Sequence, residues 1–125
     1  MLKDKSSSAI LAVSDIDRAR RFYRDTLQLD LMDGGMDEVL VFKTGVTHLI
    51  VYRSDEAGTT RANAVVWGVD DEIETIVDAL RSKGLTFEQY PGIGEIVDKA
   101  IHKTGDMKMV WFKDPDGNIL HLNNL

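Results

Sequence analysis

Two stretches of the chain decide the fold, because they are two copies of one pattern. Residues 8–15 are Ser-Ala-Ile-Leu-Ala-Val-Ser-Asp, and residues 64–71 are Ala-Val-Val-Trp-Gly-Val-Asp-Asp. Aligning them places Leu11 on Trp67 and Val13 on Val69. A repeat of this size is one supersecondary module that cannot bury its apolar face alone. We therefore expect two similar modules that share a sheet and form a cleft.

Each copy leads into an amphipathic helix. The first helix is expected from a cap at Ser14 or Asp15 to about residue 27, and the second from about Asp71 to Lys83, ended by Gly84. Apolar residues recur at helical spacing in both segments. These residues are Ile16, Ala19, Tyr23 and Leu27 in the first helix, and Ile73, Ile76, Val77 and Leu80 in the second.

The remaining segments complete the order βαβββ in each copy. Strands are predicted at residues 8–13, 38–43 and 47–53, and then at 64–69, 85–90, 108–113 and 119–123. Turns are predicted at Asp33-Gly34-Gly35, Thr44-Gly45, Pro91-Gly92 and Asp114-Pro115-Asp116-Gly117. The fold class is therefore α+β, as one domain of residues 1–125. Module one spans about 8–57 and module two about 62–125, joined by a link at residues 58–61.

The segment from Gly92 to Asp106 is long for a connection in a compact domain. Its glycines would suit the hinges of a lid, with Ile93, Ile96, Val97 and Ile101 covering an apolar ligand. Alternatively, Ile96 to His102 forms a short helix at a dimer interface. We expect His102 to be a surface residue in either case.

Composition excludes several classes of function. The chain has 125 residues, is 43% hydrophobic and 29% charged, and carries a formal net charge of −6. An acidic chain lacks the attraction to phosphate that nucleic-acid binders use, and anionic membranes would repel it. Cysteine is absent, which excludes disulfides and thiol chemistry. The N-terminus has no apolar stretch like that of a signal peptide, so we expect a cytoplasmic protein without nucleic-acid or membrane partners.

The C-terminal stretch from Trp111 to Leu122, Trp-Phe-Lys-Asp-Pro-Asp-Gly-Asn-Ile-Leu-His-Leu, resembles the final hairpin of the vicinal oxygen chelate superfamily. That superfamily includes glyoxalase I, bleomycin-resistance proteins and extradiol dioxygenases. Residues 15–27 resemble its first helix, and residues 52–59 and 87–92 resemble a glyoxalase-like subgroup. The resemblance implies two βαβββ modules that form a curved, partly open mixed β-barrel with the helices outside. It also implies a homodimer.

In that fold, strand alternation sorts the side chains into two faces. Those expected to pack against the helices are Leu11, Val13, Trp67, Val69, Phe112, Leu120 and Leu122. Those expected to face the cleft are Ser8, Ile10, Ala12, Ile50, Tyr52, Ala64, Val66, Met109, Trp111, Ile119 and His121. Glu88 and Tyr90 are expected near the same site.

The resemblance places a divalent metal in many relatives, held by side chains on four inward strands. The corresponding positions here are Ser8, Ile50, Ala64 and His121. Isoleucine and alanine side chains have no donor atoms, and one histidine cannot hold a catalytic metal alone. We therefore expect no cofactor. An atypical site using His48, His121 and Glu88 is the alternative.

The sequence leaves three functions open. The first is a metal-free module that binds a small amphipathic or aromatic molecule, with apolar walls for affinity and a few polar groups for orientation. Its ligand-binding residues are predicted to be Ser8, Ile50, Tyr52, Ala64, Glu88, Tyr90, Met109, Trp111 and His121. The second is a lyase- or isomerase-type enzyme with His121 as the catalytic acid or base, its tautomer set by Tyr52 or Glu88. The third is a subunit with a filled pocket that acts by association, which an exposed apolar patch would indicate.

Overall fold

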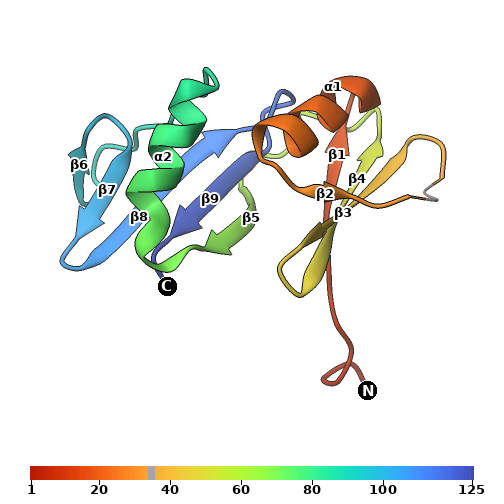
Figure 1. Ribbon diagram of the computed structural model, residues 1–125, viewed down its shortest axis with the longest axis horizontal. Helices are drawn as coiled ribbons and strands as arrows, with labels where there is room; N and C mark the ends of the chain where they lie inside the picture. The colour runs from red at the N-terminus through yellow and green to blue at the C-terminus, as the bar shows by residue number, and fades with distance from the viewer. Residues whose placement is uncertain (34–35) are drawn as a thin grey trace. The chain divides into compact units, whose positions relative to one another are not determined.

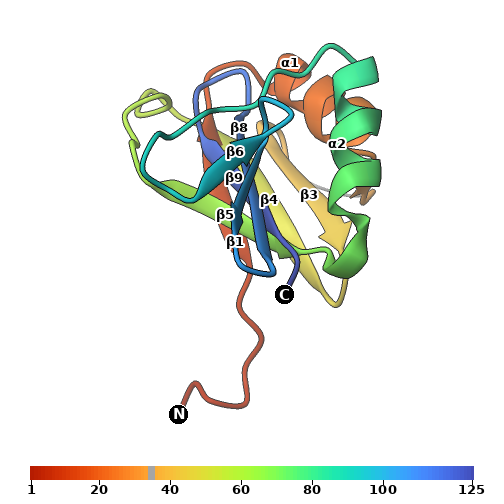
Figure 2. The same cartoon turned by 90° about the vertical axis from the view of Figure 1, so that its left-hand side faces the viewer.

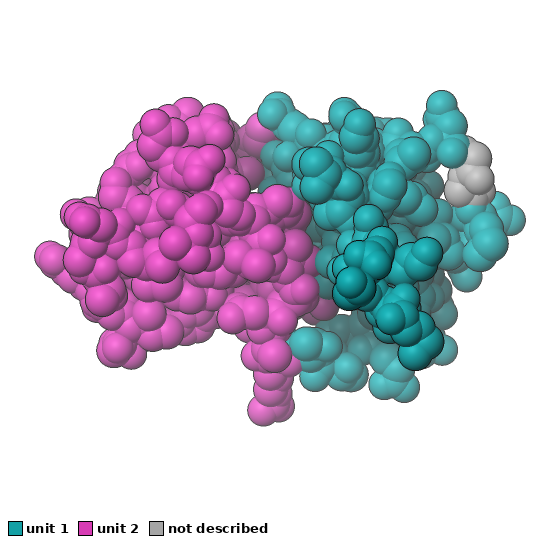
Figure 3. All heavy atoms as spheres, turned by 90° about the horizontal axis from the view of Figure 1, so that it is seen from below, with its two compact units in different colours: residues 1–60 teal, residues 61–125 magenta. Residues whose placement is uncertain are grey.

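The computed structural model describes residues 1–33 and 36–125, which form two compact units, Met1–Thr60 and Arg61–Leu125 (Figure 3). The boundary between them falls inside the predicted link at residues 58–61. Gly34 and Gly35 of the predicted turn after Asp33 lie outside the described residues. Each unit has the order β-α-β-β-β with additional short elements, so the predicted α+β class is confirmed. The assignment of residues 1–125 to one domain stays a prediction.

Unit 1 carries a four-stranded mixed sheet in the order β1-β4-β3-β2 (Figure 1). Strand β1 runs parallel to β4, and the other pairs are antiparallel. Its elements are β1 (Ala9–Val13), α1 (Ile16–Arg20), the π-helical turn η1 (Arg21–Thr26), β2 (Asp30–Leu31), β3 (Val39–Thr44) and β4 (Thr47–Arg53).

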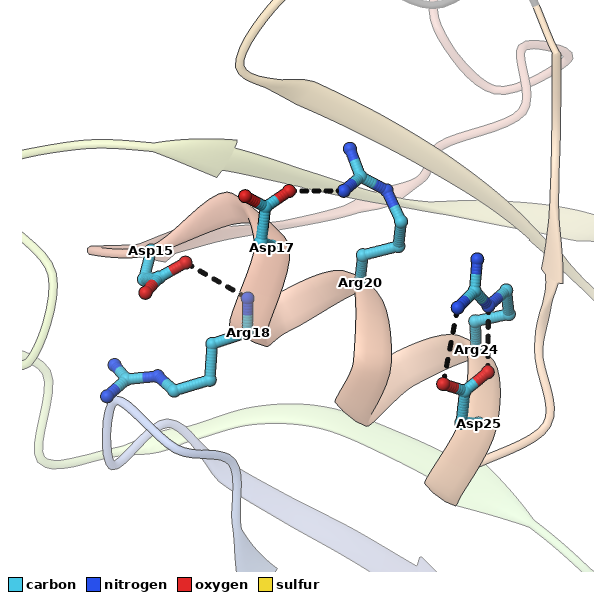
Figure 4. A network of polar contacts seen from close by, with 6 residues as sticks. All are labelled: Asp15, Asp17, Arg18, Arg20, Arg24 and Asp25. Atoms are coloured by element: carbon cyan, nitrogen blue, oxygen red, sulfur yellow. Dashed lines mark hydrogen bonds and ion pairs between the residues drawn. The ribbon is translucent and has the colours of Figure 1, made fainter.

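Helix α1 begins where the sequence predicts it. The Asp15 carboxylate accepts a hydrogen bond from the Arg18 backbone N–H at 3.0 Å, which satisfies one of the free donors of the first turn (Figure 4). The helix then widens into η1, where the Leu27 N–H bonds to the Phe22 carbonyl five residues back. The predicted end near residue 27 is therefore confirmed, although the last turns are not α-helical.

The core of unit 1 lies between the helix and one face of its sheet. Its buried side chains come from every second strand position and from the helix stripe; they are Leu11, Val13, Leu40, Phe42, Leu49, Val51, Ala19 and Tyr23. Tyr23 and Phe42 are fully buried, with ring centroids 5.8 Å apart. The alternation places Ile10, Ile50 and Tyr52 on the opposite, non-helical face, as predicted.

Unit 2 carries a five-stranded mixed sheet in the order β5-β9-β8-β7-β6 (Figures 1 and 2). Only the β5–β9 pair within this sheet is parallel. The elements are β5 (Asn63–Gly68), the 3-10 turn η2 (Asp70–Glu72), α2 (Ile73–Ser82), β6 (Glu95–Val97), β7 (Ile101–Thr104), β8 (Met107–Lys113) and β9 (Ile119–Asn123).

In the core of unit 2, alternate strand residues face the helix as predicted. Its buried helix side chains are Ile73, Val77 and Leu80, and its buried strand side chains include Val110, Phe112, Leu120 and Leu122. Trp67 and Val69 are only half-buried. Trp67 pairs with Leu122 in register, so its side chain lies on the predicted face. It is less completely buried because β5 lies at the edge of the sheet.

Two predictions for unit 2 are wrong. Residues 85–90 do not form a strand; Phe87 alone makes an isolated bridge to Phe112. The segment from Gly92 to Asp106 is neither a loose lid nor a helix, because β6 and β7 form a hairpin whose second strand pairs with β8. Arg81 of α2 holds the tip of this hairpin through a 2.6 Å ion pair with Asp98 and a hydrogen bond to the Asp98 carbonyl.

The hairpin depends on a glycine at its start. Gly94 has φ +63°, and a Cβ there would meet the Lys103 carbonyl oxygen at 2.4 Å. Gly94→Ala is therefore expected to lower the free energy of unfolding by about 1–3 kcal/mol, measured by urea denaturation. Gly105→Ala is the matched control, since Gly105 has φ +59° but open space around it. Equal losses in both variants would contradict a role for the close approach.

The described residues contain no helix that is long and apolar enough to cross a membrane.

Candidate functional site

The residues predicted to line the cleft fall into both units, and each set has its own surroundings. In unit 1, Ile50 pairs with Ile10 on β1 and with Val41 on β3, so the middle of the non-helical face is hydrocarbon. Ser8 precedes β1, and its hydroxyl lies 3.3 Å from the Thr47 hydroxyl. Tyr52 is half-buried at the end of β4. This face therefore offers apolar surface with hydroxyl groups at its margins.

In unit 2, four rings gather on the non-helical face of the sheet. The ring cluster consists of Tyr90, His102, Trp111 and His121. His121 lies directly across from Trp111 on the neighbouring strand and stacks on it, with centroids 4.6 Å apart and planes 20° from parallel. Tyr90 and His102 contact the indole edge-to-face, at 5.4 and 4.9 Å. The Trp111 side chain is only 7% exposed, whereas His121 is half-buried.

His121 is held by groups of its own sheet. Its Nδ1 lies 3.0 Å from the Val110 carbonyl oxygen, which can only accept, so Nδ1 carries the proton. Its Nε2 lies 3.4 Å from the Asn123 side-chain nitrogen. Glu88 was the predicted partner within this unit, but its carboxylate faces Lys113 at 3.5 Å. The prediction that Glu88 sets the tautomer is therefore wrong. The Val110 carbonyl at Nδ1 is one of the groups that set the tautomer.

Burial lowers the pKa of the His121 imidazole below its ordinary value of 6.5, and the hydrogen bond to Val110 partly offsets this effect. The folded protein therefore binds fewer protons at this site than the unfolded chain. We expect the stability contributed by His121 to be complete above pH 6.5 and to be lost as the pH falls through the folded-state pKa. Urea denaturation at several pH values checks this expectation. His121→Phe should flatten this part of the profile, and an unchanged profile would contradict it.

His102 was predicted to lie on the surface, and this prediction is wrong. It is fully buried, and both of its ring nitrogens are used. Nδ1 donates to the Ala100 carbonyl at 3.1 Å, and Nε2 accepts from the Tyr90 backbone N–H at 3.0 Å. Through these two hydrogen bonds, His102 holds the segment before β6 against β7. Its place opposite Met109 on β8 could not be inferred without the hairpin register.

The other predicted residues of unit 2 lie around the ring cluster. Burial raises the pKa of the Tyr90 hydroxyl, and the Glu88 carboxylate adds to the effect. Met109 is half-buried between His102 and Asn123 in the sheet register. Ala64 lies at an irregularity, where the β5–β9 register shifts between Asn63 and Val65. Its side chain therefore offers only a methyl group to the site.

Comparison with known proteins identifies the family. The sequence pattern of the glyoxalase/bleomycin resistance protein/dioxygenase superfamily matches residues 6–122. The chain belongs to this superfamily. The resemblance found in the C-terminal hairpin and the first helix is thereby confirmed. None of the curated proteins matches the chain.

Several solved structures share the fold. Lactoylglutathione lyase from Agrobacterium tumefaciens is 18% identical, with a TM-score of 0.72 over 96% of this chain and 92% of that one. The fosfomycin resistance protein FosX from Listeria monocytogenes is 11% identical, with a TM-score of 0.74 over the same shares. An integron cassette protein from the metagenome of the Halifax Harbour sewage outfall is 16% identical, with a TM-score of 0.72 over 98% and 99%. At these identities the likeness shows the fold alone.

The metal that the glyoxalase superfamily implies does not fit the residues present. Ile50 is surrounded by hydrocarbon in unit 1, and Ala64 offers only a methyl group in unit 2. Within residues 1–33 and 36–125, no three His, Cys, Asp or Glu side chains come together as metal ligands. His48 lies in unit 1 and Glu88 pairs with Lys113, so the alternative set with His121 is not assembled within either unit.

A hollow of about 550 Å³ lies elsewhere in unit 2, beside the start of α2 and the β7–β8 turn. It is lined by Asp70, Asp71, Glu74, Lys103, Gly105, Asp106, Lys108 and Asn124. Lys108 pairs with Glu74 across it and lowers the pKa of that carboxyl. No sequence pattern indicated this hollow, because its lining residues come from three separate segments.

Proposed function

We propose that the chain is a metal-free small-molecule-binding protein of the glyoxalase/bleomycin-resistance type, and that its ligand binds against the ring cluster. The observation that carries this proposal is the His121–Trp111 stack. It combines a fixed, half-buried imidazole with aromatic surface on a face that is otherwise mostly apolar. Apolar walls with a few oriented polar groups are typical of small-molecule sites.

The composition of the site favours a small amphipathic or aromatic ligand. Val66 on β5 lies beside His121 in the register and is 57% exposed, so it offers apolar surface next to the imidazole. Stacked or edge-to-face contacts suit a planar ring. The formal net charge of −6 would steer a cationic ligand toward the protein, with more effect on the association rate than on affinity.

Indole, a planar probe with one N–H, tests the proposal by NMR titration. We expect saturable shifts in the resonances of Trp111, His121 and Tyr90. His121→Phe keeps a ring that can stack on Trp111 but removes both nitrogens. It should weaken binding roughly 2- to 10-fold, the value of one net hydrogen bond. A His121→Phe variant that binds as tightly as the wild type would contradict an orienting role for the imidazole.

An enzyme that uses His121 as a base is the second candidate. The lowered pKa favours it, because the imidazole then stays unprotonated near neutral pH. The two candidates differ in outcome, since a binding protein returns its ligand unchanged. Prolonged incubation followed by mass spectrometry of the small molecule separates them.

We also propose a homodimer, in line with the resemblance. Two large apolar side chains on edge strands support it. Ile10 on β1 is 62% exposed and Val66 on β5 is 57% exposed, and both point away from the helices. Ile10 lies in unit 1 and Val66 in unit 2, and each gives the edge of its own sheet an exposed apolar side chain, which is a common feature of association surfaces. Sedimentation of the wild type and of Ile10→Lys and Val66→Lys variants tests this assembly; a monomeric wild type would overturn it.

A further inference from the structure

We infer that Asn123 is a positioning residue that keeps His121 in one tautomer and makes its Nε2 a hydrogen-bond acceptor for the ligand. This inference deepens the proposed function and rests on it for the ligand. Asn123 was not among the residues predicted for the site. It lies two residues after His121 on β9 and therefore on the same face of the sheet.

The orientation of the Asn123 amide follows from the backbone. Its Oδ1 lies 3.1 Å from the Leu125 backbone nitrogen, which carries a hydrogen and can only donate. The oxygen of the amide must therefore point toward Leu125. Its NH2 group, which can only donate, is left facing the imidazole at 3.4 Å. The usual ambiguity between amide oxygen and nitrogen is thus removed by a second contact.

The amide and a backbone carbonyl then determine where the His121 proton lies. Nδ1 faces the Val110 carbonyl, an acceptor, and Nε2 faces the Asn123 NH2, a donor. Only the Nδ1–H tautomer satisfies both contacts. Protonation of Nε2 would set one N–H against another, so the amide opposes the cationic form as well as the other tautomer.

This arrangement sets the chemistry of the ligand. The contact from Asn123 is longer than an ordinary hydrogen bond, so the Nε2 lone pair can also accept from a ligand at closer range. The partner of His121 must then donate through an N–H or O–H group. A planar molecule that carries only acceptors would be left with its lone pairs facing that of Nε2. The ligand class is therefore a planar aromatic compound with a hydrogen-bond donor at its edge.

Long-range ¹⁵N–¹H NMR of the ligand-free protein tests the role of Asn123. We expect Nδ1–H in the wild type and a larger share of Nε2–H in Asn123→Ala, because only the Val110 carbonyl then favours Nδ1–H. In Asn123→Asp the carboxylate can accept from Nε2–H, and the pKa of His121 should rise by roughly 1–2 units. Asn124→Ala is the matched control, because Asn124 bonds to the backbone of Lys108 and Asp106 instead. A wild-type Nε2–H tautomer, or an unchanged tautomer and pKa in both Asn123 variants, would overturn the inference.

Binding of indole and 1-methylindole tests the ligand class, because 1-methylindole carries a methyl group in place of the N–H donor. We expect indole to bind the wild type roughly 2- to 10-fold more tightly. Equal affinities would overturn the acceptor role of Nε2. If neither compound binds, the proposed function fails, whereas the NMR measurement still decides whether Asn123 sets the tautomer.

Discussion

Trp111→Ala is expected to lose the ligand site and much of the stability of unit 2. The indole ring is 7% exposed and contacts all three other members of the ring cluster. Replacing a buried tryptophan with alanine costs about 3–5 kcal/mol, because the cavity refills only partly. Binding of the indole probe should weaken roughly 10- to 100-fold, since about 1.4 kcal/mol corresponds to each factor of ten. Urea denaturation and NMR titration measure the two effects.

Trp111→Phe distinguishes the loss of the ligand-binding surface from the loss of the folded structure. Phenylalanine keeps a ring against His121 and leaves a smaller cavity, so this variant should fold and retain part of the affinity. If Trp111→Ala does not fold, the Phe variant carries the test. An affinity equal to that of the wild type in every folded variant would show that Trp111 is only a core residue.

His102→Phe is the second change with a large expected effect. It preserves a ring beside Trp111 but leaves the Tyr90 N–H and the fully buried Ala100 carbonyl without their partner. An unsatisfied buried group costs about 1–3 kcal/mol, so the two together should lower the free energy of unfolding by about 2–6 kcal/mol. Hydrogen exchange should also become faster at the Tyr90 amide, whose acceptor has been removed.

His48→Phe is the control for that substitution. It makes the same chemical change at a half-buried position on β4, opposite Lys43, and should alter stability by about 0.5 kcal/mol or less. A His102→Phe variant as stable as this control would show that the two hydrogen bonds of His102 contribute little.

The repeat predicted most of the fold because alternation and helical spacing are local signals. Strands β4 and β9 have the predicted bounds, and Leu11, Phe112 and Leu120 are buried on the predicted face. These residues follow from period-2 patterning alone. The family resemblance agreed with the repeat because both depend on the same strands.

The β6–β7 hairpin could not be predicted because its turn has no glycine or asparagine where the backbone has positive φ. Asp98 and Lys99 have φ values of +55° and +57°, a conformation that normally favours glycine or asparagine. Here Arg81, distant in the sequence, binds both the carboxylate and the carbonyl of Asp98. A tertiary contact thus stabilises a turn that local propensity disfavours.

The ring cluster was also predicted only in part, because part of it depends on tertiary contacts that local sequence does not show. Trp111 and His121 were predicted to share one face of the sheet, and the structure also pairs them because they lie on adjacent strands of one hairpin. His102 was missed because its position depends on the β7–β8 register. The partners of His121 were also missed. One is the Val110 backbone carbonyl, which no side-chain pattern reveals, and the other is Asn123, which was not among the residues predicted to face the cleft.

Native mass spectrometry of the purified protein, with elemental analysis of the same sample, tests the central claim most directly. A metal-free binding protein should contain no stoichiometric divalent metal, and its mass should increase by that of a bound small molecule, either co-purified or added as indole. One equivalent of a divalent metal that survives dialysis would contradict the metal-free account. It would direct attention to a site that includes His121 and to enzyme chemistry.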